Sequence, residues 1–505
     1  MNGIVVTEET MPTLATVPEE KNTENGKKDV FTTKEAVFSV LCFVLAFGFT
    51  HFVAGYAGGL WGGVVWMATG IFGAVYVRMK RITVTKLHCV VFGVAEVFCL
   101  VPLFCTNEFV NTLAAIFTFL LLGYLGVSLS GAELFGEHFA ADLFEGICIR
   151  PFTRFEKAPQ AAKSLVKHPK CGKTFLYVVV GLLCSLPLSL VVWYLLMGSD
   201  AMFADRMESL FDMLPSFEFS YVWELILAVP VWLYLFGGFA AMQTPWTKPC
   251  MDMKKGRVLP AVLGYATVTP ICVFYVLYIA VQFHYFTAAF GGTLPEEYSY
   301  SAYARQGFFE LCAIAVINLC VIVFMNLFLK RKEDGTASVA MKVYCTLLAG
   351  FTILLIVSAL SKMVLYIKEM GMTPLRIYTS WFMLVLVMLF VLVMVVQFTK
   401  LRFCKAAFVG FTVLFAVLCF SNVDGMIANY NVKAYQTGKL ESVDFDVLRN
   451  LGDAALVPLE RLTEAEDVAT ATQARVWYER MRVESNSKNS VAYFSIPRVI
   501  ARKVK

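Results

Sequence analysis

Apolar residues along this chain fall into blocks of about twenty, separated by shorter polar stretches. A helix of about twenty residues crosses the hydrocarbon layer of a bilayer, which is roughly 30 Å thick. The blocks therefore predict an all-α fold, a polytopic integral membrane protein with about eleven transmembrane helices. The predicted spans cover residues 35–55, 58–78, 87–105, 108–130, 175–197, 219–241, 259–284, 306–329, 340–361, 377–399 and 403–420.

The polar stretches divide the chain into three parts. Residues 1–32 form a polar tail, and residues 33–420 form the transmembrane helix bundle. Residues 421–505 carry charges of both signs and predict a small helical segment outside the membrane. Inside the bundle region, residues 131–174 form a long loop, acidic in its first part and basic in its second.

Composition supports the membrane assignment. Apolar residues make up 58% of the 505 residues and charged residues 16%, against about a quarter charged in ordinary soluble domains. The net charge of +5 does not suggest nucleic-acid binding. The 14 cysteines lie mostly inside apolar runs and form no C-x-x-C pair, so neither a disulfide framework nor a zinc site is expected. The sequence indicates no metal and no cofactor.

The distribution of lysine and arginine predicts the orientation. The loops that would lie on one side of the membrane carry most of these residues, and that side is normally cytoplasmic. We therefore expect a cell-membrane protein with a cytoplasmic N-terminus. An odd number of spans would place the C-terminal segment on the extracytoplasmic side, and the turn within 361–377 is the least defined.

The basic part of the long loop predicts contact with membrane lipids. Its cationic side chains are interspersed with aromatic and aliphatic ones, a pattern that favours anionic headgroups at the inner leaflet. The alternative is a topology signal with no separate role. The candidate headgroup ligands are Arg150, Arg154, Lys163 and Lys167.

Glycines near the start of the second span predict close helix packing. Gly58, Gly62, Gly59 and Gly63 form two overlapping G-x-x-x-G patterns. Small residues at this spacing let helix backbones approach each other. Packing is a better explanation for them than chemistry.

Glu96 is the most informative charged residue, because it falls near the middle of the third span. An unpaired carboxylate at the bilayer centre costs at least about 2.5 kcal/mol, and acidic residues there are often functional. One hypothesis is a proton or ion site in a transport path. The other is a neutral acid that is hydrogen-bonded to a neighbouring helix.

A second set of polar residues lies toward the outer ends of later spans. Three of them recur at i, i+4 and i+7 and so share one helix face. Together the set predicts a polar vestibule open to the outside, and the alternative is long side chains that reach individually to the interface. The set comprises Glu224, Tyr303, Arg305, Glu310, Lys362, Tyr366, Glu369 and Arg376.

Three stretches resemble a bacterial multi-pass membrane protein family of unknown function, domain-of-unknown-function family 4173, which is close to family 4153. The first is residues 294–311, with Tyr303, Arg305, Gly307 and Glu310; the others are 365–383 and 422–455. Val423 stands where that family typically has proline. The resemblance implies a bacterial cytoplasmic-membrane protein and brings no established activity and no catalytic residues.

Three classes of function fit these observations. The first is transport or lipid handling through the vestibule and Glu96, with membrane lipids and an unknown solute or lipid as partners. The second is a signalling or scaffold protein that acts with a partner protein. The third, a membrane transferase, generally needs an acid or histidine beside the first external loops, and residues 55–58 contain neither. The sequence thus favours a protein that is not an enzyme.

Overall fold

The computed structural model describes residues 31–55, 59–136, 139–165, 220–246, 257–291, 308–332, 336–487 and 494–502, together with the isolated positions 185, 189 and 192. All secondary structure in these residues is helical, apart from one isolated bridge between Leu259 and Leu329. The expected all-α class is confirmed. The predicted span at 175–197 lies almost entirely outside the described residues.

Ten helical stretches in the described residues are long and apolar enough to cross a membrane. They match the other predicted spans to within a few residues, except that the helix predicted at 340–361 continues to Met370. The stretches are built from α1 (Thr33–Phe49) with η1 (Thr50–Gly55), α2 (Leu60–Lys80), α3 (Lys86–Phe98) with α4 (Val101–Phe104), α5 (Glu108–Leu129), α11 (Ser220–Ala241), α12 (Ala261–Gly291), α14 (Phe308–Phe328), α15 (Val339–Met370), α16 (Pro374–Phe398) and α17 (Phe403–Phe420).

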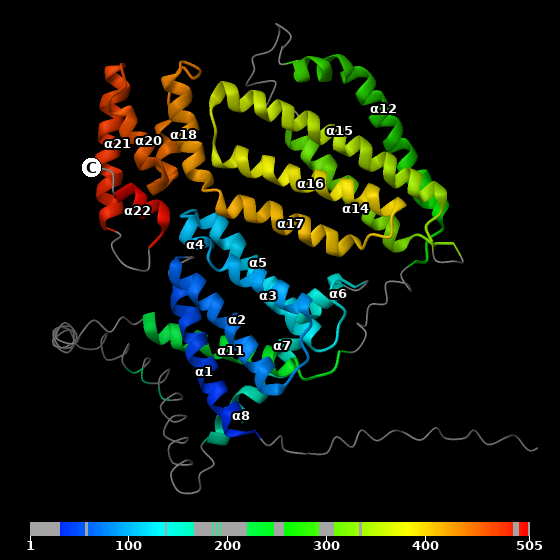
Figure 1. Ribbon diagram of the computed structural model, residues 1–505. Coiled ribbons are helices and arrows are strands. Elements are labelled where there is room, and N and C mark those ends of the chain that lie inside the picture. The colour runs from blue at the N-terminus through cyan, green and yellow to red at the C-terminus, as the bar shows by residue number, and fades with distance from the viewer. Residues whose placement is uncertain are drawn as a thin grey trace, which may run out of the picture.

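The long helices form two groups, which Figure 1 shows below and above the middle of the molecule. The N-terminal group contains α1, α2, α3, α5 and α11, and the C-terminal group contains α12, α14, α15, α16 and α17. We call the end at which α2 turns into α3 and α17 begins the basic end, because Arg78, Arg81 and Arg402 lie there. Arg402 at this end donates to Glu133, which follows α5, over 2.6 Å.

The first part of the 131–174 loop folds back onto the N-terminal group. It forms α6 (Phe139–Phe144), η2 (Glu145–Ile149), α7 (Arg150–Thr153) and α8 (Lys157–Leu165). Ser39 near the start of α1 donates to the Ala158 carbonyl of α8 over 2.9 Å, whereas Glu224 near the start of α11 contacts the other end of α1. The two described stretches that flank the 175–197 range therefore lie at opposite ends of the bundle.

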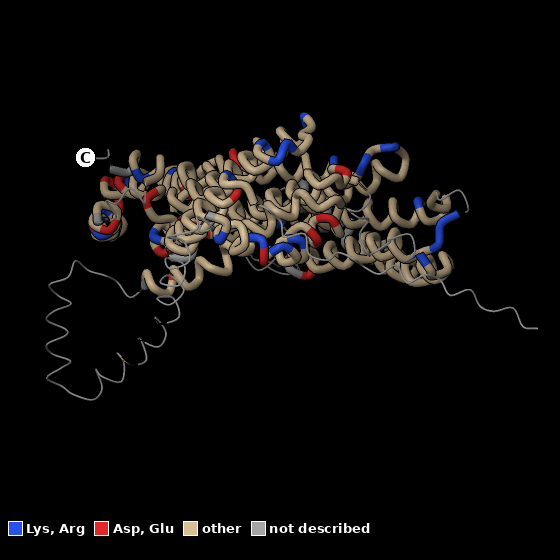
Figure 2. Tube along the Cα trace, turned by 90° about the horizontal axis from the view of Figure 1, so that it is seen from below, with Lys and Arg blue, Asp and Glu red and all other residues tan. Residues whose placement is uncertain are grey.

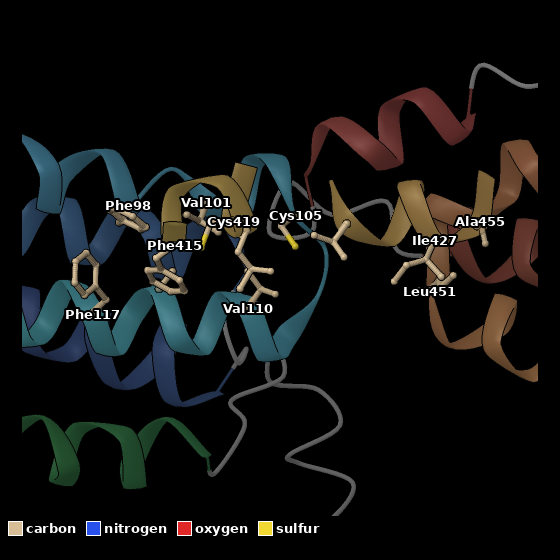
Figure 3. Packing of buried hydrophobic residues seen from close by; sticks show 14 of the residues in the cluster. Phe98, Val101, Cys105, Val110, Phe117, Phe415, Cys419, Ile427, Leu451 and Ala455 are labelled. Carbon is tan, nitrogen blue, oxygen red and sulfur yellow. The ribbon is translucent and has the colours of Figure 1, made fainter. Parts of the chain in front are cut away.

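Helix α17 joins the two groups through aromatic packing. Phe415 of α17 stacks on Phe98 of α3 at 5.2 Å between ring centroids and meets Phe117 of α5 edge-on at 5.4 Å. On its other side, Trp381 of α16 donates to the Leu414 carbonyl over 2.9 Å. Figure 3 shows this core, which continues from Phe98 and Phe415 to Ile427 beyond the end of α17.

The chain after α17 forms a compact C-terminal segment at the end opposite the basic end (Figure 1). Figure 2 shows charged residues within this segment and toward helix ends, with mostly uncharged helix between them. The segment consists of α18 (Val423–Gln436), α19 (Phe445–Asn450), η3 (Gly452–Ala455), α20 (Leu456–Leu462), α21 (Val468–Ser487) and α22 (Ile496–Arg502).

Asn431 of α18 holds the segment onto the turn between α15 and α16. Its side-chain oxygen accepts from the Met372 amide over 2.7 Å, and its side-chain nitrogen donates to the Met372 carbonyl over 2.8 Å. A side-chain amide that satisfies both backbone groups of one residue replaces the partners that a three-residue turn lacks. The segment is thereby docked on the C-terminal helix group.

Candidate functional site

A cavity of about 720 Å³ lies between α2, α3, α5 and α11, toward the basic end. Its walls are mostly apolar, with Val77, Phe92, Leu125 and Phe239 among the lining residues. We call it the α2–α3 cavity. Its size falls within the roughly 300–1,000 Å³ typical of ligand sites.

The α2–α3 cavity opens sideways as well as at its end. Ala74 on α2 and Cys89 on α3 both line it and are exposed, and so does Val84 in the connecting turn, with 49% of its surface exposed. In a membrane-spanning bundle, exposed apolar helix faces are those that lipid chains cover. Part of the cavity lining is therefore also part of the outer surface of the bundle.

Glu96 lies beside the inner part of this cavity. Its carboxylate packs against Gly70 of α2, where a methyl group would overlap it, and Gly70 and Phe92 both line the cavity. Within the described part of the chain, no cation and no hydrogen-bond donor contacts this carboxylate. The hypothesis of a hydrogen bond to a neighbouring helix therefore finds no partner among these residues.

The basic mouth of the cavity is formed where α2 passes into α3. Arg78 and Arg81 line it and are exposed, and Arg81 adopts a left-handed conformation, with φ of 54°, that ends α2. Neither guanidinium forms an ion pair or a hydrogen bond with any residue that the structure describes. Two cations thus face the opening of an otherwise apolar space.

His88 also lines the cavity, but its ring is held by the protein. The Thr85 amide donates to Nδ1 over 3.1 Å, so the proton of a neutral ring lies on Nε2, which is 3.0 Å from Ser128 Oγ. Ser128 in turn donates to the Ala132 carbonyl over 3.0 Å. This chain ties the start of α3 to the end of α5 and fixes the cavity wall.

The expected lipid-headgroup residues fall into different environments. Arg150 is buried and bonded to Glu145 over 3.0 Å and to Ser130, with the Thr244 and Pro245 carbonyls near its other nitrogen. Its donors are engaged inside the protein rather than held out to a lipid surface. Arg154 is half-buried and Lys163 is exposed, while Lys167 lies outside the described residues.

The described residues of the expected vestibule do not all meet in one place. Glu224 bonds to His51 of η1 over 2.8 Å. Arg376 lies over the Tyr366 ring at 3.9 Å and donates to the Met370 carbonyl over 3.1 Å, which caps the end of α15.

The other described members of that set differ in burial. Lys362 is buried in α15, whereas Glu369 and Glu310 are exposed. Tyr303 and Arg305 lie outside the described residues. The described members are thus divided between the two helix groups, and none of them lines the α2–α3 cavity.

A buried acid that the sequence reasoning did not single out lies at the opposite end. Asp424 of α18 is 4% exposed and accepts from Asn107, which precedes α5, over 3.3 Å. Burial raises the pKa of Asp424 to about 6, against an ordinary value of 3.8, and the bond from Asn107 offsets this in part. This contact attaches the C-terminal segment to the N-terminal helix group as well.

Sequence reasoning also missed the α2–α3 cavity and the contact of Asn431 with the Met372 backbone. No local pattern marks Gly70 as the neighbour of Glu96, because they belong to different helices. The sequence did contain a signal for the bond between Thr85 and His88. Thr85 precedes the third span as a helix N-cap residue, and His88 follows three residues later, at the position whose side chain can bond back to the cap. Asn431 was part of a motif of the resemblance, but its contact with Met372 depends on the fold.

These features define an α-helical, multi-pass membrane protein with a side-opening cavity and a docked C-terminal segment. The family described as Domain of unknown function (DUF4153) matches residues 92–462, and the chain belongs to it. The match spans most of the bundle and half of the C-terminal segment. No curated protein and no solved structure matches the chain.

Proposed function

We propose that this protein handles a membrane lipid, which it takes from the bilayer into the α2–α3 cavity. The observation that carries the proposal is the cavity itself: about 720 Å³, apolar walls, a lateral opening and, at its mouth, two arginines that have no ion-pair partner among the described residues. A small polar solute would make no favourable contact with the apolar walls. An amphiphile can place its apolar part against these walls and its polar part at the arginines of the mouth. The proposal moves the site of lipid handling from the outer vestibule to the basic end.

Glu96 belongs to the same proposal. It is a carboxyl group in a membrane-spanning helix, beside a cavity and without a partner among the described residues. Such groups commonly serve proton or ligand pathways. We propose that Glu96, which packs against Gly70 without lining the cavity itself, marks the inner limit of the bound lipid.

Filling the cavity should prevent lipid binding. Ala74→Trp places a large ring in the opening, whereas Ile71→Trp, one turn away on α2, changes an exposed residue that does not line the cavity. Native mass spectrometry of protein purified in mild detergent should show bound lipid in the wild type and in Ile71→Trp, and lose it in Ala74→Trp. Equal lipid content in all three proteins would refute the proposal.

The finer assignments are proposals of the same kind. The narrower family 4173, a bacterial origin and the cytoplasmic membrane follow from the motif at residues 294–311. We also propose that the basic end is cytoplasmic, because it carries the arginines of the turns, and that the C-terminal segment is extracytoplasmic.

A further inference from the structure

The dimensions of the α2–α3 cavity indicate how a lipid would lie in it. Its lining along α2 runs from Thr69 to Arg81, which caps the helix, and twelve residue steps of α-helix span about 18 Å. One leaflet contributes about half of a hydrocarbon layer roughly 30 Å thick, or about 15 Å. The cavity is therefore about as long as one leaflet is deep.

The two ends of the cavity differ in charge. Arg78 and Arg81 stand where α2 ends, which is where the headgroups of a leaflet begin. No acidic residue lines the cavity at this end, and neither arginine has an ion-pair partner in the described chain. His88 adds no free charge there, because its ring is bonded to Thr85 and Ser128.

We infer that the ligand is an anionic phospholipid of the leaflet at the basic end, with its phosphate at Arg78 and Arg81 and one acyl chain along α2 toward Gly70. This inference rests on the proposed lipid handling and adds the headgroup class and the leaflet. Guanidinium groups bind phosphate in a bidentate manner, and a net negative headgroup leaves charge for the second arginine. A zwitterionic headgroup would place its own cation beside the two arginines, which would repel it.

Headgroup selectivity tests the inference. Spin-labelled phosphatidylglycerol and phosphatidylcholine are compared in phosphatidylcholine vesicles that contain the full chain, and the immobilised fraction of each label is measured. Each basic residue near a surface favours an anionic lipid by about fivefold. The wild type should prefer phosphatidylglycerol, and the double variant Arg78→Gln/Arg81→Gln should lose about five- to thirtyfold of that preference.

Lys405→Gln is the matched control, because Lys405 is an exposed cation of α17 near the same end that does not line the cavity. It should keep the wild-type preference.

Three results would overturn the inference or its basis. Equal immobilisation of both lipids by the wild type overturns the anionic headgroup but leaves lipid handling intact, provided that Ala74→Trp still abolishes binding. Equal losses in the double variant and in Lys405→Gln mean that surface charge alone attracts the lipid. No immobilised lipid in the wild type removes both the inference and the proposed function.

Discussion

Asp424 shows how one buried side chain makes docking of the C-terminal segment depend on pH. The described residues that interact with it are Asn107, Cys105 and Tyr378, and none of them carries a positive charge. The carboxylate sits in the first turn of α18, where the helix dipole favours it, but burial outweighs this and raises its pKa. The folded protein therefore holds this proton more tightly than the unfolded chain does.

The sign of the pH effect follows directly. Because the pKa of Asp424 rises from 3.8 to about 6 on folding, the free energy of unfolding should fall as pH rises between these values. At 1.36 kcal/mol for each pH unit, the cost of the ionised form is about 3 kcal/mol. Asp424→Asn should match the wild type near pH 4 and exceed it by about this amount at pH 7, measured as protection of the α18 amides from hydrogen exchange.

Asp467 provides the control for that experiment. It is exposed, and bonds from the Thr470 side chain and from the backbone lower its pKa, so its contribution to stability is lost as pH falls rather than as it rises. Asp467→Asn should thus not increase the free energy of unfolding at pH 7. If the wild type and Asp424→Asn showed parallel pH profiles, burial would not be what raises the pKa of Asp424.

At the scale of elements, glycines decide how closely α2 and α3 approach. Gly63 faces the break between α3 and α4, where a methyl group would overlap the Cys99 carbonyl and lie 3.5 Å from Pro102. Gly70 faces Glu96 one heptad further along α2. The close packing expected from the glycine pattern is thus made at Gly63, against a backbone atom that cannot rotate away.

Gly63→Ala should destabilise the protein by about 1–3 kcal/mol, the usual cost of overpacking. Gly93→Ala is its matched control, because Gly93 of α3 has no neighbouring atom within 4 Å of a new methyl group and alanine is the better helix former. The midpoint of thermal unfolding in detergent measures both. A Gly63→Ala protein as stable as Gly93→Ala would show that α2 and α3 separate without cost.

The sequence predicted elements far better than it predicted the site. Runs of apolar residues located each described span because the bilayer sets their length. The span predicted at 340–361 stopped before Lys362, the first charged residue after its apolar run, whereas α15 continues to Met370 and carries Lys362 and Glu369 on its last turns. Glu96 was recognisable from its position near the middle of a predicted span. The roles of Gly70 and Arg78 and the cavity between them depend on how separate helices pack.

At the scale of the whole molecule, the two ends of the bundle differ in what they carry. Arg78, Arg81 and Arg402 lie at one end and the C-terminal segment at the other. Helix α17 begins at the basic end and leads directly into α18, so the side of the C-terminal segment does not depend on the undescribed 175–197 range.

The proposed orientation predicts the behaviour of reporter fusions. Alkaline phosphatase folds only outside the cytoplasm, so a fusion after Lys505 should be active, whereas a fusion truncated after Lys332, between α14 and α15, should be inactive at equal expression. The reverse pattern would place the basic end outside, and equal activity at both sites would contradict the arrangement of the bundle.

The double attachment of the C-terminal segment also limits how the molecule moves. Asp424 bonds to Asn107 of one helix group, and Asn431 clamps the Met372 turn of the other. The Arg402–Glu133 ion pair connects the same two groups at the basic end, so the groups are held together at both ends of the bundle. The α2–α3 cavity lies within the N-terminal group alone, and a change in the width of its mouth would therefore require α2 and α3 to move relative to each other rather than one group to move against the other.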